Sequence, residues 1–265
     1  PLVGHAATVK PSAPSSYVVD LDANVVRAAE RAEIVRPIAS LTKLMTAMVL
    51  LDAHADLGRT VAYDPKRHYA YRNWMWFRTG DRLTGRDLLL TTLVGSQNIT
   101  ARMLADVARI PESTVVARMN AKAQSLGLVQ TRFVDVHGLS PKNISTAGEV
   151  ARMFEVALTY PDIADVLGRG SARVTITPKR GKARTALFSH TNVLLKRTQR
   201  FATEASKTGY LDEAGDALAM RVRDPKSGHR FIVVTLGEPR RNPRFSIAKR
   251  LAEAAVHTQQ IARVR

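Results

Sequence analysis

The chain has 265 residues, of which 45 % are hydrophobic, so it carries enough apolar side chains to bury the core of one or two domains. This excludes a largely disordered protein. The absence of cysteine excludes disulfides, thiolate metal sites and thiol nucleophiles. The longest stretch without a charged residue, Leu88 to Ala101, contains too many polar side chains to span a membrane.

The formal net charge of +17 favours a polyanionic neighbour, such as nucleic acid, an anionic membrane face or a cell-wall polymer. Residues 169–200 hold nine Lys or Arg and no acidic residue. This basic region is either a patch that docks an anionic wall or membrane surface, or an ordinary solvated face. Because no recognised nucleic-acid motif accompanies it, we do not expect a nucleic-acid partner.

The first elements form a hairpin. Residues 1–16, rich in Ala, Pro and Ser, predict a flexible lead-in. Two β-rich runs, 17–21 and 25–28, flank turn-forming residues and predict a strand pair. From Ser40 the apolar residues recur at helical spacing, which predicts a helix.

The middle of the chain reads as helical and its final third as strands. Apolar periodicity predicts helices at 86–94, 99–108, 113–126 and 147–158, within a helical lobe from about 60 to 160. Strands are predicted at 173–177, 205–208, 217–223 and 230–236, before a last helix from about 243 to 264. Strands at both ends predict an α/β (α+β) protein whose two chain ends share one antiparallel sheet, with residues 17–265 as a single domain.

The strongest local signal is Ser40-Leu-Thr-Lys43. At a helix start, positions i and i+3 lie on one face, so the serine hydroxyl and the lysine amine can form a hydrogen bond. This pairs a nucleophile with a base. Alone, the pattern is common and equally describes a capping serine followed by a solvated lysine.

Two further motifs follow in order. Ser96-Gln97-Asn98 lies between two predicted helices, where a tight loop would present a hydroxyl and an amide. Lys207-Thr208-Gly209 lies in the strand-rich third, where a glycine lets a substrate backbone approach a strand closely. Three such motifs, in this order and on these element types, are unexpected by chance.

With these motifs the chain resembles the penicillin-recognising serine D,D-peptidases, whose set is S-x-x-K, S-D-N and K-T-G. It looks most like the low-molecular-mass penicillin-binding proteins, the D-alanyl-D-alanine carboxypeptidases and D,D-endopeptidases of bacterial peptidoglycan. Segments 38–47, 119–123, 131–133, 138–140 and 145–147 also look like family sequence. Only about 56 residues follow Gly209, which favours the single-domain branch associated with endopeptidase activity.

The resemblance implies a β-lactamase/transpeptidase-like fold. In it a five-stranded antiparallel sheet is flanked by helices and joined to an all-helical lobe, with the active site between them. Ser40 is then the nucleophile that forms an acyl-enzyme, and Lys43 the base. Burial and the positive charge of Lys207 would lower the pKa of Lys43 and keep it neutral. Ser96 would pass the proton to the leaving amine.

The resemblance also implies how substrate is held. The backbone N–H groups of Ser40 and Tyr210 would form the oxyanion hole. Gln97 replaces the aspartate of the S-D-N pattern, at a position that varies in the family. Substrate-binding roles fall to Asn98, Lys207, Thr208 and Gly209. Asn98 would hold Lys43 and a substrate amide, and Lys207 and Thr208 would bind the carboxylate on the leaving side.

Two other functions remain open. A class A β-lactamase shares the motifs but needs a glutamate to activate the deacylating water. None of the four candidates, Glu112, Glu149, Glu155 and Glu204, stands in the E-x-x-L-N context of those enzymes. The second alternative is a wall-binding protein that keeps the motifs without turnover.

No cofactor or metal is expected, because the histidines are scattered and H-E-x-x-H is absent from the sequence. Asp135 and His137 are expected to form only a loop hydrogen bond. The expected partners are peptidoglycan stem peptides, with β-lactam antibiotics as covalent inhibitors. A periplasmic, extracytoplasmic location follows from that substrate. The start at Pro1, without Met or a signal stretch, fits a chain whose targeting segment has been removed.

Overall fold

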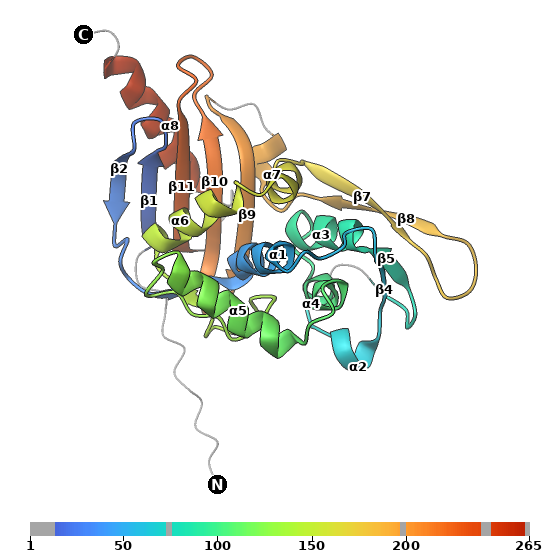
Figure 1. Cartoon of the computed structure of the whole chain (residues 1–265). Coiled ribbons are helices and arrows are strands. Elements are labelled where there is room, and N and C mark those ends of the chain that lie inside the picture. The colour runs from blue at the N-terminus through green and yellow to red at the C-terminus, as the bar shows by residue number, and fades with distance from the viewer. Residues whose placement is uncertain (1–13, 73–75, 197–199, 240–244, 263–265) are drawn as a thin grey trace.

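The computed structural model describes residues 14–72, 76–196, 200–239 and 245–262 (Figure 1). Its main sheet is antiparallel and has the strand order β2-β1-β11-β10-β9. The strands are β1 (Ser15–Asp20), β2 (Val25–Glu30), β9 (Ala202–Leu211), β10 (Gly215–Arg223) and β11 (Arg230–Glu238). The two ends of the chain therefore meet in one sheet, as the strand pattern predicts.

The first strand starts earlier than expected. β1 begins at Ser15 and not at Tyr17, because Ser15 and Ser16 pair with Leu236 and Thr235 of β11 and are buried there. Two serines carry no β-strand signal in the sequence, so only the partner strand determines their conformation. The remainder of the predicted lead-in, residues 1–13, lies outside the described residues.

Both faces of the sheet are buried. On β11, Phe231 and Val233 pack against helix α8 (Ser246–Ala262), whereas Ile232 and Val234 belong to the larger core on the opposite face. This alternation follows from the two-residue period of a strand. Figure 1 shows α8 behind the sheet and α6 (Ala147–Ala157) across its front.

Helix α1 (Thr42–Asp52) runs through the centre of the molecule, and residues 42–50 are all buried. It contacts four of the surrounding helices. These are α3 (Gly85–Leu93), α4 (Asn98–Val107), α5 (Glu112–Ser125) and α6. Because α1 is buried along most of its length, the side chains at its N-terminus are held in fixed positions.

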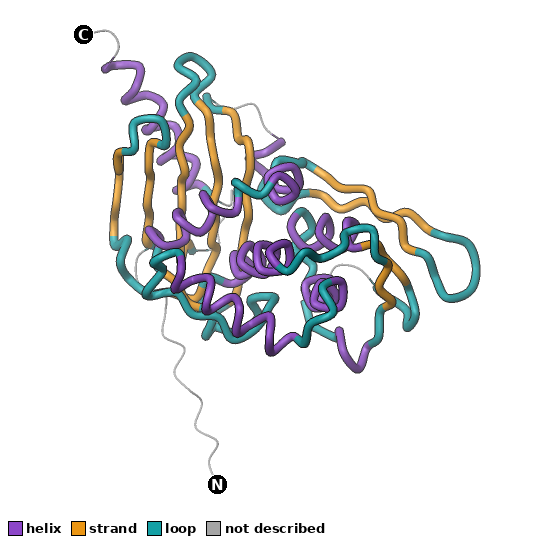
Figure 2. Tube along the Cα trace, in the orientation of Figure 1, coloured by secondary structure: helices purple, strands orange, loops and turns teal. Residues whose placement is uncertain are grey.

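The lobe from about 60 to 160 is not all helical, which corrects that prediction. β4 (Thr60–Ala62) pairs with β5 (Arg82–Thr84), and β3 (Arg36–Pro37) with β6 (Ile144–Ser145). Strands of two or three residues are too short to show an alternating pattern. Two short helices were also missed, α2 (Pro65–His68) and α7 (Pro161–Leu167). Figure 2 shows that helices nevertheless make up most of this lobe.

Residues 171–189 of the basic region form a projecting hairpin. β7 (Ser171–Ile176) matches a predicted strand, but its partner β8 (Arg184–Ser189) was not predicted, because its apolar residues do not alternate. Figure 1 shows the hairpin extending beyond the helical lobe. Within the described part of the chain, no helix combines the length and apolar character that crossing a bilayer requires.

Candidate active site

Ser40 lies in a single turn of 3-10 helix, Ala39–Leu41, that leads directly into α1. Two glycines from other parts of the chain, Gly138 and Gly209, pack closely against this turn. A Cβ on Gly138 would lie 2.0 Å from the carbonyl oxygen of Ala39, and one on Gly209 would lie 3.0 Å from the Ser40 nitrogen. Ala39 itself has φ 46, a conformation that side chains disfavour. The packing therefore holds Ser40 in place directly after a strained residue, Ala39.

Lys43 lies one turn further along, under Ser40. Its Nζ donates hydrogen bonds to Ser40 Oγ at 2.7 Å, to Asn98 Oδ1 at 2.7 Å and to the His137 carbonyl oxygen at 2.5 Å. The Lys43 side chain is completely buried. The i and i+3 positions of the first motif are thus joined as the sequence predicts.

A second lysine, Lys207 of the third motif, forms a hydrogen bond with Ser96 of the second motif. Lys207 is also fully buried, in β9, and its Nζ donates to Ser96 Oγ and to the Thr208 carbonyl oxygen, both at 2.8 Å. Ser96 has φ 54, so its loop holds a backbone conformation that is unfavourable for serine. The fold therefore brings together residues that are far apart in the sequence.

Burial lowers the pKa of Lys43 to about 7, and the carboxylate of Asp135 acts in the opposite direction. Burial, followed by repulsion from Lys43, lowers the pKa of Lys207 well below its ordinary value. The resemblance predicts that burial and the charge of Lys207 both act on Lys43. Burial of both lysines is present, and because repulsion between two amines is mutual, it disfavours a charge on each of them.

Asn98 is buried at the start of α4. Its Oδ1 accepts from Lys43, and its Nδ2 donates to the carbonyl oxygens of Tyr71 at 2.9 Å and Arg72 at 3.1 Å. The resemblance predicts that Asn98 holds both Lys43 and a substrate amide. The contact with Lys43 is present, and the amide nitrogen also joins this pair to the 71–72 loop.

The third motif lies on β9, the edge strand of the sheet nearest α1 (Figure 1). Thr208 Oγ1 lies 2.5 Å from Thr191 Oγ1. The close approach of Gly209 to the Ser40 nitrogen brings this strand, with Tyr210 following Gly209, against Ser40. The Tyr210 hydroxyl points away to Asp212 Oδ1 at 2.8 Å, so only its backbone is left for the role expected from the sequence.

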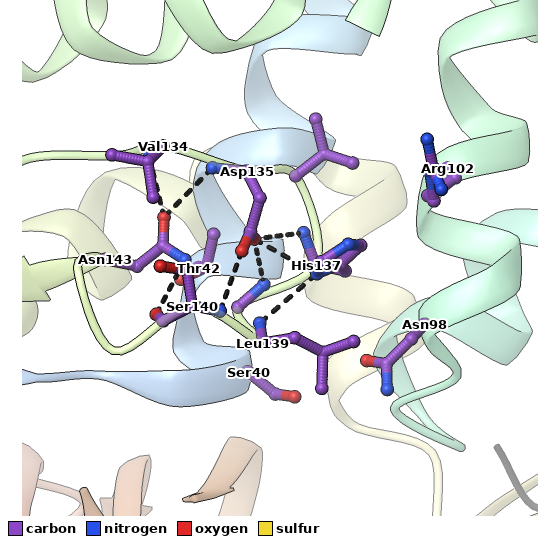
Figure 3. A network of polar contacts seen from close by, with 12 residues as sticks. Ser40, Thr42, Asn98, Arg102, Val134, Asp135, His137, Leu139, Ser140 and Asn143 are labelled. Atoms are coloured by element: carbon purple, nitrogen blue, oxygen red, sulfur yellow. Dashed lines mark hydrogen bonds and ion pairs between the residues drawn. The ribbon is translucent and has the colours of Figure 1, made fainter. Parts of the chain in front are cut away.

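A loop that sequence reasoning assigned no function, residues 134–143, lies beside Ser40 (Figure 3) and contacts Lys43 through the His137 carbonyl oxygen. The Asp135 carboxylate accepts from the backbone N–H groups of His137, Gly138 and Ser140 at 3.0, 2.5 and 2.8 Å. Burial acts to raise its pKa, but His137 and these N–H groups hold the pKa well below its usual range. The expected loop hydrogen bond is confirmed, and it orients the His137 carbonyl toward Lys43. In the sequence, Gly138 between polar residues was the feature that could have indicated a closely packed loop here.

Among the described residues, one cluster has the composition of a metal site. Ligand atoms of Asp20, Asp22 and His229 all lie within 4.8 Å of one another. However, Arg27 donates to Asp20 at 2.8 Å and Arg230 to Asp22 at 2.9 Å. These arginines already balance the carboxylates, so the cluster is explained as an ion-pair network.

A family model described as D-alanyl-D-alanine carboxypeptidase, Peptidase_S11, matches residues 4–240. The chain belongs to this family of serine peptidases. It is similar to the D-alanyl-D-alanine endopeptidase of Escherichia coli K12, with 35 % identity over 211 residues, which are 78 % of this chain and 66 % of the relative. The endopeptidase of Pseudomonas aeruginosa is 33 % identical over 83 % of this chain and 70 % of its own length. The chain thus spans about two thirds of these relatives.

Solved structures of the family share the fold. The D-alanyl-D-alanine carboxypeptidase of Mycobacterium tuberculosis H37Rv superposes with a TM-score of 0.77 at 28 % identity, covering 93 % of this chain and 92 % of that one. Penicillin-binding protein D2 of Listeria monocytogenes, in a cefotaxime-bound form, gives 0.73 at 25 % identity, covering 90 % and 95 %. The transpeptidase-like fold inferred from the resemblance is confirmed.

Each of the four candidates for the single glutamate that a class A β-lactamase needs has another partner in this structure. Glu112 accepts from Arg102 at 2.7 Å, and Glu149 accepts from Thr131 at 2.5 Å. Glu155 lies 3.6 Å from Arg152, and Glu204 accepts from Arg223 at 2.9 Å. Each carboxylate thus serves a structural contact away from Ser40.

Proposed function

We propose that this chain is a serine D,D-peptidase of bacterial peptidoglycan that works through an acyl-enzyme on Ser40. One observation carries the proposal. Ser40 Oγ lies 2.7 Å from the amine of a buried lysine, Lys43, whose pKa is about 7. Near neutral pH a large fraction of this amine is uncharged, so it can accept the serine proton.

In the proposed reaction, Lys43 takes the proton of Ser40 while Oγ attacks the carbonyl carbon of a D-alanine. The N–H groups of Ser40 and Tyr210 stabilise the resulting oxyanion. As the C–N bond breaks, Ser96 gives its proton to the leaving amine and takes up the proton that Lys43 removed from Ser40, which leaves Lys43 neutral again. The hydrogen bond between Ser96 and Lys207 supports this role. Water then attacks the ester, which releases the shortened peptide and restores Ser40.

Lys207 and Thr208 are proposed to hold the carboxylate of the leaving residue. A lysine amine and a threonine hydroxyl are suitable donors for a carboxylate. Thr208 lies on the edge strand β9, and Gly209 beside it leaves room for a substrate backbone. A terminal D-alanine and the D-centre of a cross-linked diaminopimelate both offer such a carboxylate. The same anchor therefore serves carboxypeptidase and endopeptidase reactions.

Endopeptidase activity on D-alanyl–diaminopimelate cross-links is proposed as the main reaction. Relatives named D-alanyl-D-alanine endopeptidase, from Escherichia coli, Pseudomonas aeruginosa and Haemophilus influenzae, are 31 % to 35 % identical over 76 % to 83 % of this chain. A relative named carboxypeptidase, from Mycobacterium tuberculosis, is 34 % identical over 58 % of it. The substrate lies outside the cytoplasm, so we also propose a periplasmic, extracytoplasmic location.

Intact-protein mass spectrometry after brief exposure to benzylpenicillin tests the proposal. A stable one-to-one adduct on the peptide that contains Ser40 is expected, together with cleavage of a purified cross-linked muropeptide dimer. β-Lactams are covalent partners in this proposal, and the cefotaxime-bound Listeria relative supports it. An adduct that disappears within seconds would indicate a β-lactamase. A folded protein that forms no adduct would indicate a wall-binding protein without turnover.

The basic hairpin is proposed to contact an anionic polymer of the cell wall. Lys179, Arg180 and Lys182 are exposed where the hairpin turns, and its described residues include no carboxylate. Replacing the three by glutamate is expected to lower binding to purified sacculi at low salt severalfold, because like charges repel. Co-sedimentation measures this, with cleavage of a soluble muropeptide dimer as the control. Unchanged binding to sacculi, or a loss seen only with anionic lipid vesicles, would contradict the proposal.

A further inference from the structure

A groove of about 420 Å³ opens next to the candidate active site. One wall consists of Gly95 and Gln97, from the loop between α3 and α4. The other wall is formed by residues 186–189 of β8 and by Thr191. The mechanism above does not use this groove, although its volume is in the range of small-ligand sites.

The groove follows the free edge of β8. Alternate residues of a strand point to opposite faces, yet four consecutive residues of β8 line the groove, so it lies along the strand's edge. The His190 N–H bonds Gly170 on the β7 side, so by alternation the backbone groups of Leu187 and Ser189 point toward the groove. In the described part of the chain, no strand pairs with that edge.

The groove begins where the leaving group is expected to sit. Gly95 and Gln97 stand on either side of Ser96, the proposed proton donor to the leaving amine. On the opposite wall, Thr191 bonds to Thr208, a proposed anchor of the leaving carboxylate, at 2.5 Å between hydroxyl oxygens. The groove is therefore positioned to receive groups attached to the leaving residue beyond its carboxylate.

The two candidate leaving groups differ in what they would place there. A terminal D-alanine offers only a methyl group, which leaves most of the groove empty. A cross-linked diaminopimelate offers an aliphatic arm followed by the amides of a second stem peptide. Phe188 and the exposed Leu187, with 65 % of its surface accessible, provide apolar surface for the arm. The unpaired edge of β8 offers backbone donors and acceptors for the amides.

We infer that this groove is the leaving-side subsite for the second stem peptide of a cross-link, and that it gives the enzyme its capacity for endopeptidase cleavage. The inference rests on the proposed peptidase function, which it makes more specific. It predicts that a bulky side chain in the groove affects endopeptidase and carboxypeptidase cleavage differently, although both reactions use Ser40. Cleavage of cross-links fails, whereas reactions with small leaving groups continue.

The test is Ser189→Trp, which places a large ring on an exposed position of the groove wall. Cleavage of a D-alanyl–diaminopimelate muropeptide dimer is expected to fall about tenfold or more, because steric exclusion from a pocket produces effects of this order. Removal of D-alanine from a linear pentapeptide and acylation by benzylpenicillin are expected to stay within about twofold of wild type.

Ser171→Trp is the matched control, since Ser171 is exposed and pairs with Ser189 across the hairpin but does not line the groove. It should leave all three reactions unchanged. If Ser189→Trp fails to fold, Leu187→Ala replaces it and should raise KM for the dimer alone. Equal loss of all three reactions in a folded variant, or no loss of dimer cleavage, overturns the inference. Wild-type protein that cleaves the pentapeptide but not the dimer also overturns it. Absence of any adduct or cleavage in wild type instead contradicts the proposed function.

Discussion

Ser40→Ala is expected to abolish the covalent benzylpenicillin adduct and to reduce peptide cleavage by about a thousandfold or more, because the proposed acyl-enzyme forms on the Ser40 hydroxyl. The Lys43 amine beneath it has no second hydroxyl within the contacts that the described residues show, so no neighbour substitutes for the lost nucleophile. Intact mass after antibiotic exposure and the rate of dimer cleavage measure the two effects.

The control is Ser125→Ala, which removes an exposed serine hydroxyl at the end of α5. It should keep the full adduct and full activity. The thermal unfolding temperature of Ser40→Ala should stay close to that of wild type, because Ser40 is only partly buried and its hydroxyl contributes one hydrogen bond to Lys43. Labelling that survives in the Ser40→Ala protein would move the nucleophile to another residue.

The rate of acylation is expected to rise with pH through a midpoint near 7. Burial lowers the pKa of Lys43 to about 7, so the amine is protonated below this pH and cannot accept the serine proton. As pH increases the neutral fraction grows, and the rate should approach a plateau by about pH 8. Below pH 6 the rate should fall about tenfold per pH unit. Stopped-flow acylation by benzylpenicillin between pH 5 and 8 provides the measurement.

Lys43→Arg serves as the comparison, because it keeps a positive charge that cannot be lost in this pH range. It should lower the acylation rate by about a hundredfold or more and remove the rise with pH. Lys142→Arg, on an exposed part of the loop after Ser140, should change neither. A wild-type rate that stays flat from pH 5 to 8 would show that Lys43 is not the titrating base.

Several parts of this protein follow from the sequence alone. Helical spacing from Leu41 placed Ser40 and Lys43 on one face of a helix, and the two lie 2.7 Å apart. Alternating and β-rich runs placed β1, β10 and β11 correctly, to within a few residues. These features depend on neighbouring residues and on local periodicity, which is why a single chain read in order reveals them. The order and character of the three motifs likewise pointed to the family.

Only the tertiary structure decided how those motifs work together. Asn98 lies 55 residues from Lys43 and accepts its hydrogen bond, while its amide donates to a loop that no motif marks. The His137 carbonyl reaches Lys43 because Gly138 has no side chain to hold the loop away from Ala39. Desolvation of both lysines depends on complete burial, which no local pattern encodes. The groove along β8 also requires a strand that the sequence did not predict. Contacts between distant segments lower the pKa of Lys43 and form the groove beside Ser96, so both features became visible only once the chain was folded.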